Sequence, residues 1–172
     1  MNQKTFTNTV IFIIIGIILV GAIGYIAVIN KKSSKVTQTP AQTQIVYANT
    51  QYGFNFSLPA SWKGYTIVTS TWQGDMIEEP SQKLTGPEIS IRHPLWTSAN
   101  PRQDIPIMIF TPAQWNLIQQ ERLSLGAAPI GPSELGHNAN YYFALPARYN
   151  FAFPTGFEEV DQIIAGKPLQ AF

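Results

Sequence analysis

The sequence predicts an α+β fold, with an antiparallel sheet of about five or six strands, two helices packed on it and one N-terminal transmembrane helix before it. Three observations lead to this prediction. Residues 10–29 form an apolar run without a charged side chain. Several later segments are short, rich in β-branched and aromatic residues, and alternate with a period of two. Two helix starts occur at residues 111 and 155, and strands and helices do not alternate as they do in a parallel sheet.

The apolar run is long enough to cross a bilayer. At about 1.5 Å per residue, a helix over residues 10–29 would span about 30 Å, the thickness of the hydrocarbon core. The alternative is a cleaved secretory signal, whose apolar region covers about 7–15 residues and ends in a small-x-small site. Here only Ala22-Ile23-Gly24 has that form near the end, and bulky residues follow it within the run. An uncleaved anchor is therefore the favoured interpretation.

The chain divides into four parts around this anchor. They are an N-terminal tail at 1–9, the span at 10–29, a flexible linker at 30–44 and a globular domain at 45–172. The linker is rich in Ser, Thr, Gln and Pro, which is typical of a solvated stalk beside an exported domain. Three lysines just after the span favour the opposite, cytoplasmic orientation by the positive-inside rule, but the excess over the N-terminal side is small. We expect a single-pass protein of the cell membrane with its domain outside the cytoplasm.

Charge and cysteine content exclude several classes of function. Residues 45–172 carry seven Lys and Arg against ten Asp and Glu, a net charge of −3. A mildly acidic domain lacks the basic surface that a phosphate backbone requires, so no nucleic acid is expected as a partner. The chain has no cysteine, which excludes disulfides, thiolate catalysis and Cys-ligated metal centres.

The domain opens with the clearest strand. Phe54, Phe56 and Leu58 alternate with polar residues, and Pro59 ends the pairing because it lacks an N–H group. Further strands are predicted at 65–72, 88–93, 105–110 and 140–146. Residues 105–110 are wholly apolar, which indicates a strand that is central in the sheet or covered on both faces. Residues 74–87 and 129–136 are predicted to be polar loops.

Both helices are predicted from their first turns. Thr111, Pro112 and Gln114 combine a capping hydroxyl, a proline at the first helical position and a capping-box partner, and the apolar spacing continues to Gly126. The second helix is predicted over 155–166. Thr155 is expected to cap it, and acidic residues in the first turn suit the helix dipole.

Two resemblances support this fold. The stretch YANTQYGFNFSLPASW, residues 47–62, resembles the first hairpin of Mog1/PsbP-like domains. The stretches ISIRHPLW, RQDIPIMIFTPAQW, AAPIGPSELG and ALPARYNFAFP resemble an uncharacterised bacterial membrane-anchored group. The first resemblance implies an α+β domain of the kind that bacteria often export or anchor. Neither resemblance implies an activity.

The sequence contains no motif for a metal, a nucleotide or a nucleophile. With His93 and His137 as the only imidazoles, and no H-E-x-x-H, a zinc site is not expected. No phosphate-binding loop or G-x-G-x-x-G occurs, and no serine has a G-x-S-x-G context. We therefore expect no cofactor.

One connection between strands gathers chemically useful side chains. The connection follows Arg92 and His93, the last residues of the strand predicted at 88–93. It contains Trp96 and ends at Asp104. Arg148, in the aromatic segment ARYNFAFPTGF, completes the set of candidate binding residues. The alternative interpretation is structural, with an Arg92–Asp104 or an Arg102–Asp104 pair that only fixes the loop.

Three functions are compatible with these features. The favoured one is a membrane-tethered extracytoplasmic binding or adaptor domain whose partner is an envelope protein or the cell wall. The alternative is a cell-envelope enzyme, hydrolase-like, that uses His93 with Asp104 and a nearby Arg. The third is a passive role in the assembly of a membrane complex.

Overall fold

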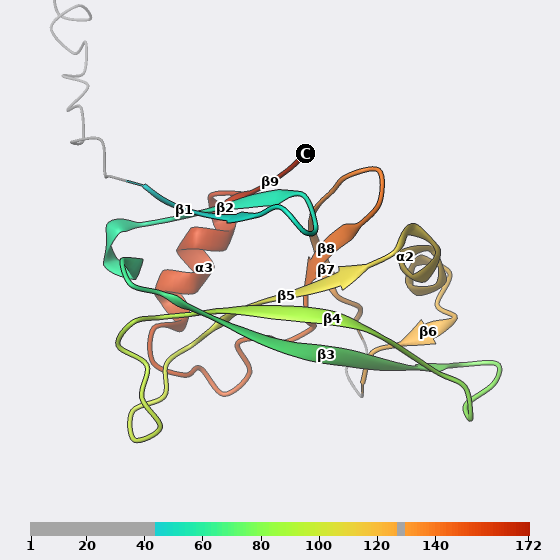
Figure 1. The fold of residues 1–172 in the computed structure, drawn as a ribbon. Helices are drawn as coiled ribbons and strands as arrows, with labels where there is room; N and C mark the ends of the chain where they lie inside the picture. The colour runs from blue at the N-terminus through green and yellow to red at the C-terminus, as the bar shows by residue number, and fades with distance from the viewer. Residues whose placement is uncertain (1–43, 127–129) are drawn as a thin grey trace, which may run out of the picture. The chain divides into compact units, whose positions relative to one another are not determined.

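The computed structural model describes residues 44–126 and 130–172, which form an α+β domain (Figure 1). The predicted tail, membrane span and nearly all of the predicted linker lie outside the described residues. No helix within 44–126 or 130–172 is long and apolar enough to cross a membrane.

A six-stranded sheet, antiparallel at every pairing, forms the larger part of the domain, in the order β6-β3-β4-β5-β8-β7. Its strands are β3 (Thr66–Met76), β4 (Lys83–Arg92), β5 (Ile105–Phe110), β6 (Leu123–Ser124), β7 (Ser133–His137) and β8 (Tyr142–Leu145). The apolar β5 lies inside this sheet, as predicted. Pro106 is tolerated there because β5 pairs with β8 only from Met108 onward.

A second, three-stranded antiparallel sheet was not predicted as such. It has the order β1-β2-β9 and contains β1 (Ile45–Asn49), β2 (Phe54–Leu58) and β9 (Leu169–Ala171). The predicted strand at Phe54, Phe56 and Leu58 is confirmed as β2, with these three side chains buried. A short 3-10 helix, η1 (Ala60–Trp62), follows Pro59.

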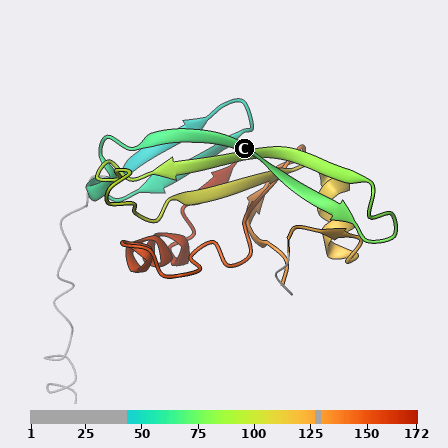
Figure 2. The same cartoon turned by 90° about the horizontal axis from the view of Figure 1, so that it is seen from below.

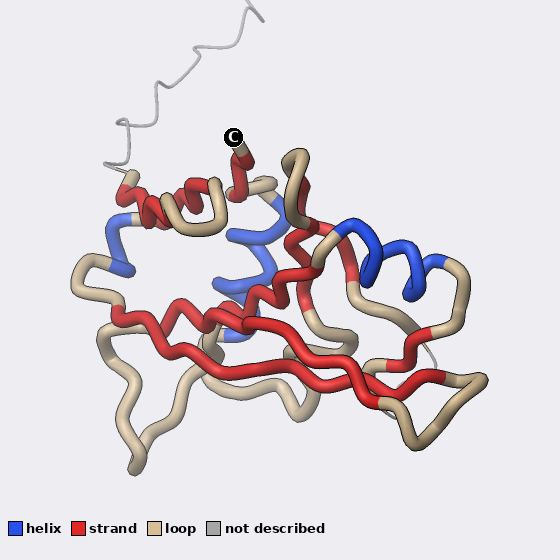
Figure 3. The backbone as a smooth tube through the Cα atoms, turned by 45° about the vertical axis from the view of Figure 1, so that its right-hand side comes forward, coloured by secondary structure: helices blue, strands red, loops and turns tan. Residues whose placement is uncertain are grey.

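The main core lies between the two sheets and α3 (Phe157–Ala165). Its fully buried side chains include Phe56 from β2, Ile91 from β4 and Val160 from α3. A second core lies on the opposite face of the six-stranded sheet, under α2 (Pro112–Gln119). Trp72, Phe110 and Trp115 belong to this second core, so the two predicted helices are both packed on the sheet but cover different faces of it. Figure 3 shows α2 and α3 in blue, like the short η1, and the two α-helices lie well apart along the sheet.

The β3–β4 ribbon is longer than predicted and runs past the small sheet toward β6 (Figure 2). Residues 74–87 were predicted to be a loop, but pairing continues to Asp75↔Lys83. Gly86 allows the pairing to continue because it has no side chain and leaves room for the indole of Trp72, the residue opposite it on β3. A Cβ atom at Gly86 would lie 2.5 Å from that ring.

The predicted helix starts have different outcomes. The capping box of Thr111 and Gln114 is confirmed, but α2 ends at Gln119 and β6 follows, so its predicted extension to Gly126 is wrong. The N-cap of α3 is Gly156, with φ 85°, and no side chain caps the helix; the predicted cap at Thr155 is also wrong. Residues 133–136 of the predicted loop belong to β7, which covers Ser133–His137.

Candidate functional site

Arg92, Trp96 and Asp104 are brought together, as the sequence suggested. The Arg92 guanidinium donates to Asp104 through Nη2 at 2.7 Å and through Nε at 3.0 and 3.2 Å. Its Cζ atom lies 3.9 Å from the centroid of the Trp96 ring. The hydrogen bonds to Asp104 raise the pKa of Arg92. Both partners are partly buried, so this bidentate pair fixes the strand ends that flank the loop.

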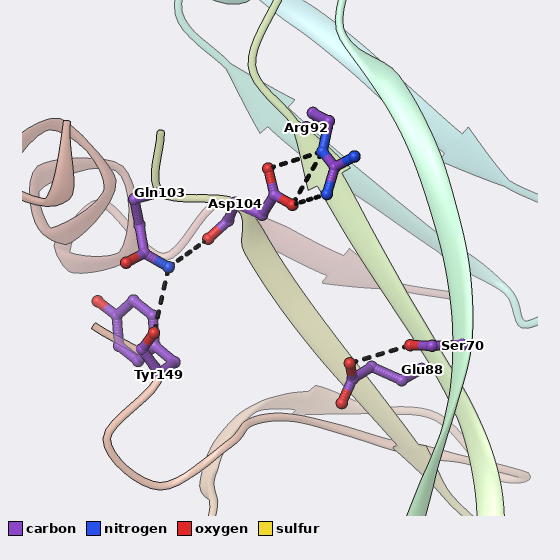
Figure 4. A network of polar contacts seen from close by, with 6 residues as sticks. All are labelled: Ser70, Glu88, Arg92, Gln103, Asp104 and Tyr149. Carbon is purple, nitrogen blue, oxygen red and sulfur yellow. Dashed lines mark hydrogen bonds and ion pairs between the residues drawn. The ribbon is translucent and has the colours of Figure 1, made fainter. Parts of the chain in front are cut away.

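Further polar contacts tie this loop to the segment before α3 (Figure 4). The Gln103 amide donates to the carbonyl of Asp104 at 2.7 Å and to that of Tyr149 at 3.2 Å. The Tyr149 hydroxyl in turn donates to Asp161 of α3. Burial and this hydrogen bond to a carboxylate raise the pKa of Tyr149. The network therefore positions the loop, although the side-chain oxygen of Gln103 is buried without a hydrogen-bond partner among the described residues.

His93 lies on the opposite face of the sheet from Arg92. Side chains of neighbouring residues in a strand point to opposite faces, so His93 follows Ile91 into the main core. It is 5 % exposed, its ring packs edge-on against Trp62 at 4.9 Å, and its Nδ1 accepts a hydrogen bond from the Leu95 backbone N–H at 3.1 Å. Burial and the charge of Arg102 lower the pKa of His93.

This lowered pKa predicts a stability that falls as the pH falls. In the unfolded chain His93 takes up a proton near its usual pKa of about 6.5, whereas in the folded domain it resists protonation until a lower pH. Above about pH 7 the His93 side chain is neutral in both the folded and the unfolded protein, so it adds no pH dependence to the free energy of unfolding. Between about pH 6.5 and the folded-state pKa the unfolded state gains the proton first, so the free energy of unfolding decreases.

The test is urea denaturation between pH 8 and pH 5, comparing the wild type with His93→Asn. The Asn side chain keeps an acceptor for Leu95 and removes the titration. We expect the wild type to lose more stability across this range than the variant. Equal slopes for the two proteins would contradict the assignment.

Arg148 does not join the other candidates. It is exposed, lies in a turn with φ 55°, and has no ion pair among the described residues. The five predicted residues thus separate into a closed cluster of Arg92, Trp96 and Asp104, a buried His93, and a solvent-facing Arg148. Whether any of them contacts a ligand stays a prediction.

An open groove lies elsewhere, between the β1–β2 hairpin and the β3–β4 ribbon. Its volume is about 540 Å³, within the range of small-ligand sites. The hairpin contributes Tyr47, Asn49, Gln51 and Tyr52. The long strands contribute Ile67, Thr69, Ser70, Thr71, Gly86, Pro87, Glu88 and Ile89.

Strand alternation decides which side chains face this groove. Thr69 is opposite Ile89, and Thr71 is opposite Pro87. Ile89 belongs to the main core, so these threonines share the face that carries the hairpin. Ser70 and Glu88 point to the other face, where the Ser70 hydroxyl donates to Glu88 at 3.1 Å (Figure 4). Glu88 is the only charged lining residue, so the groove presents neutral side chains.

The hairpin side of the groove is held rigidly. The Asn49 amide donates to the Tyr47 hydroxyl at 2.8 Å, and its oxygen accepts from the Tyr52 backbone N–H at 3.0 Å. Asn138 donates to the carbonyls of Tyr52 and Gly53, at 2.9 and 3.1 Å. Gly53 has φ 74°, and an added Cβ would lie 2.7 Å from the Phe172 carbonyl oxygen. The turn is therefore fixed by contacts to residues distant in the sequence.

Sequence reasoning did not identify this groove. Its polar lining residues are mostly tyrosines, threonines and amides, which occur throughout the chain and form no motif. Their convergence depends on the packing of one sheet over the other. The only available signal was the concentration of hydroxyl-bearing residues in 69–71, on a strand that also carries core residues.

The domain is an α+β protein of two antiparallel sheets, with a groove that is lined mainly by neutral residues and includes two tyrosines. The chain matches no protein-family model, no curated protein and no solved structure. The resemblance to Mog1/PsbP-like domains therefore stays a prediction.

Proposed function

We propose that this chain is a membrane-tethered extracytoplasmic binding protein, and that its groove takes a neutral saccharide such as a segment of a cell-wall glycan. The observation that carries the proposal is the groove between β1 and β3, which has tyrosines on one wall and neutral hydrogen-bonding side chains around them. The predicted membrane span and linker supply the location.

The chemistry of the groove favours a sugar over a charged ligand. A saccharide offers C–H faces to aromatic rings and hydroxyls to amide and hydroxyl side chains. Tyr47 and Tyr52 are partly exposed, and Gln51, Thr69 and Thr71 are exposed. Since Glu88 points away, no side chain in the groove would neutralise a cationic or anionic ligand.

The hydrolase alternative receives less support. It requires an imidazole that reaches a substrate, and His93 is enclosed by the main core with its Nδ1 bonded to the backbone. Asp104 is engaged by Arg92 in a bidentate pair. The residues chosen for catalysis thus act as structural contacts in the described domain.

The test is a calorimetric titration of the full chain in lipid nanodiscs. The titrant is the trimer of β-1,4-linked N-acetylglucosamine, a neutral glycan. Thr71→Ala removes a hydroxyl that faces the groove. Ser70→Ala is the matched control, because it removes a hydroxyl from the neighbouring residue on the opposite face. We expect Thr71→Ala to weaken binding about fivefold, the value of one neutral hydrogen bond, and Ser70→Ala to leave affinity unchanged.

Two results would overturn the saccharide assignment. One is the absence of binding at millimolar trimer, and the other is an equal effect of the two substitutions. A neutral peptide of alternating Val and Thr serves as a parallel probe. If only this peptide binds, and Thr71→Ala weakens it, the ligand class is polypeptide and the saccharide is excluded.

A further inference from the structure

The outer edge of β3 is the longest unpaired strand edge in the described domain. On its inner side β3 pairs with β4 along Thr66↔Arg92 to Asp75↔Lys83. On its outer side it pairs with β6 only at Asp75 and Met76. Backbone N–H and C=O groups of residues 66–73 that point outward therefore have no partner among the described residues. Such an edge is a template for another strand.

This edge also lacks the features that usually protect an exposed strand. Residues 66–73, TIVTSTWQ, include no charge and no proline, and the pairing with β4 shows no register shift. The other free edges are short, since β1 and β7 have five residues each and β9 has three. The edge of β7 also carries Glu134, His137 and a register shift. Native edges are commonly blunted by such charges, irregularities or short length.

We propose that a second copy of this chain pairs with β3 through its own β3, in antiparallel orientation about a two-fold axis. The strand is self-complementary because residues 66–73 carry no charge, so pairing brings no like charges opposite each other. The free backbone groups of residues 66–73 in one copy can therefore pair with the same groups in the other copy.

Symmetry restricts the register. A two-fold axis perpendicular to the sheet reverses the strand direction and preserves the two faces. Opposite residues in an antiparallel pair point to the same face, so the residue on the axis must lie opposite itself. Thr69 and Ser70 are the central residues of 66–73, and pairing along the whole free edge places one of them on the axis. Beyond Gln73 the edge is limited by β6, and before Thr66 the chain turns at Gly64.

The pairing has a consequence for the groove and goes beyond the proposed function. Because the two-fold axis preserves the faces, both β1–β2 hairpins lie on the same face of the joined sheets. The two grooves then open toward each other across a floor made of the paired β3 strands. The dimer would offer one extended cleft where each copy alone has a short one, which suits a polymeric ligand.

Cysteine crosslinking tests the pairing directly, because the chain has no native cysteine. Thr69→Cys and Ser70→Cys each introduce a single thiol at an exposed position of the full chain. Directly opposite residues have Cα atoms about 4.5–5.5 Å apart, within the range that a disulfide bridges. Ser98→Cys, exposed in the loop after β4, is the matched control. Each variant is reconstituted in vesicles and oxidised with copper phenanthroline in air.

We expect one of the two β3 variants to form a covalent dimer at least tenfold faster than Ser98→Cys. Adding Thr69→Lys to Ser70→Cys should reduce the advantage if Ser70 lies on the axis, and Ser70→Lys should do so for Thr69→Cys in the other register, because the two ammonium groups then lie on one face as diagonal neighbours across the strand pair. If neither β3 variant crosslinks faster than the control, the proposal is overturned. Saccharide titration of the Ser70→Cys single variant is a separate readout, because Ser70 points to the face opposite the groove, so loss of the dimer and loss of the ligand site are distinguishable.

Discussion

Gly86→Ala is expected to lower the free energy of unfolding by about 2–5 kcal/mol. The new methyl group would lie 2.5 Å from the Trp72 ring. That ring is 3 % exposed, packs against Phe110 at 4.6 Å and donates a hydrogen bond from Nε1 to the Ile109 carbonyl at 2.8 Å. The indole cannot retreat without breaking this buried bond and opening the second core. Urea denaturation of residues 30–172 measures the loss.

Gly131→Ala is the matched control for this substitution. An added Cβ there would contact only Ile118, at 3.8 Å, which is an ordinary van der Waals distance. We expect it to change stability by less than about 0.5 kcal/mol. If the two alanine variants are equally stable, the Trp72 indole does not lie over Gly86 as described.

The sequence signals that succeeded are local. The alternation at Phe54, Phe56 and Leu58 predicted β2, and the apolar run at 105–110 predicted an interior strand. The Thr111–Gln114 capping box predicted the start of α2, because both of its hydrogen bonds form within one helical turn. Where the determinants lie within a few residues, pattern and structure agree.

The failures concern pairings between distant segments. The strand β9 has three residues and forms only because β2 offers an edge, through Phe56↔Leu169 and Phe54↔Ala171. Residues 133–137 look like a loop, yet they pair with β8 as an edge strand. Residues 74–87 were predicted to be a loop, whereas pairing with β3 includes Gly86, which makes room for the indole of Trp72. None of these partners can be identified from the local sequence.

The candidate site shows the same division. Arg92 and Asp104 were correctly brought together because they occupy the two ends of one connection. His93 was grouped with Arg92 by proximity in the sequence, although strand alternation sends the two side chains to opposite faces. The groove needed β1 to lie over β3, which is a property of the packed domain. The sequence therefore identified the loop that Arg92 and Asp104 stabilise, but not the groove.

The proposed location depends on residues 10–29 holding the domain at the outer face of a membrane. Twenty uncharged residues, mostly Ile, Val and Leu, favour insertion by several kcal/mol, on the order of 5. Removing residues 1–29 should therefore move the protein completely from the membrane to the soluble fraction. It should also keep the domain inside the cytoplasm, because the export signal is lost with the span.

The deciding measurement is labelling of Ser98→Cys by a membrane-impermeant maleimide in intact cells, followed by membrane fractionation. We predict that the full chain sediments with membranes and is labelled without lysis, whereas residues 30–172 stay soluble and are labelled only after lysis. A full chain that is soluble with its N-terminal residues intact would contradict the tether. A full chain that is labelled only after lysis would place the domain in the cytoplasm and contradict its exposure to the cell wall.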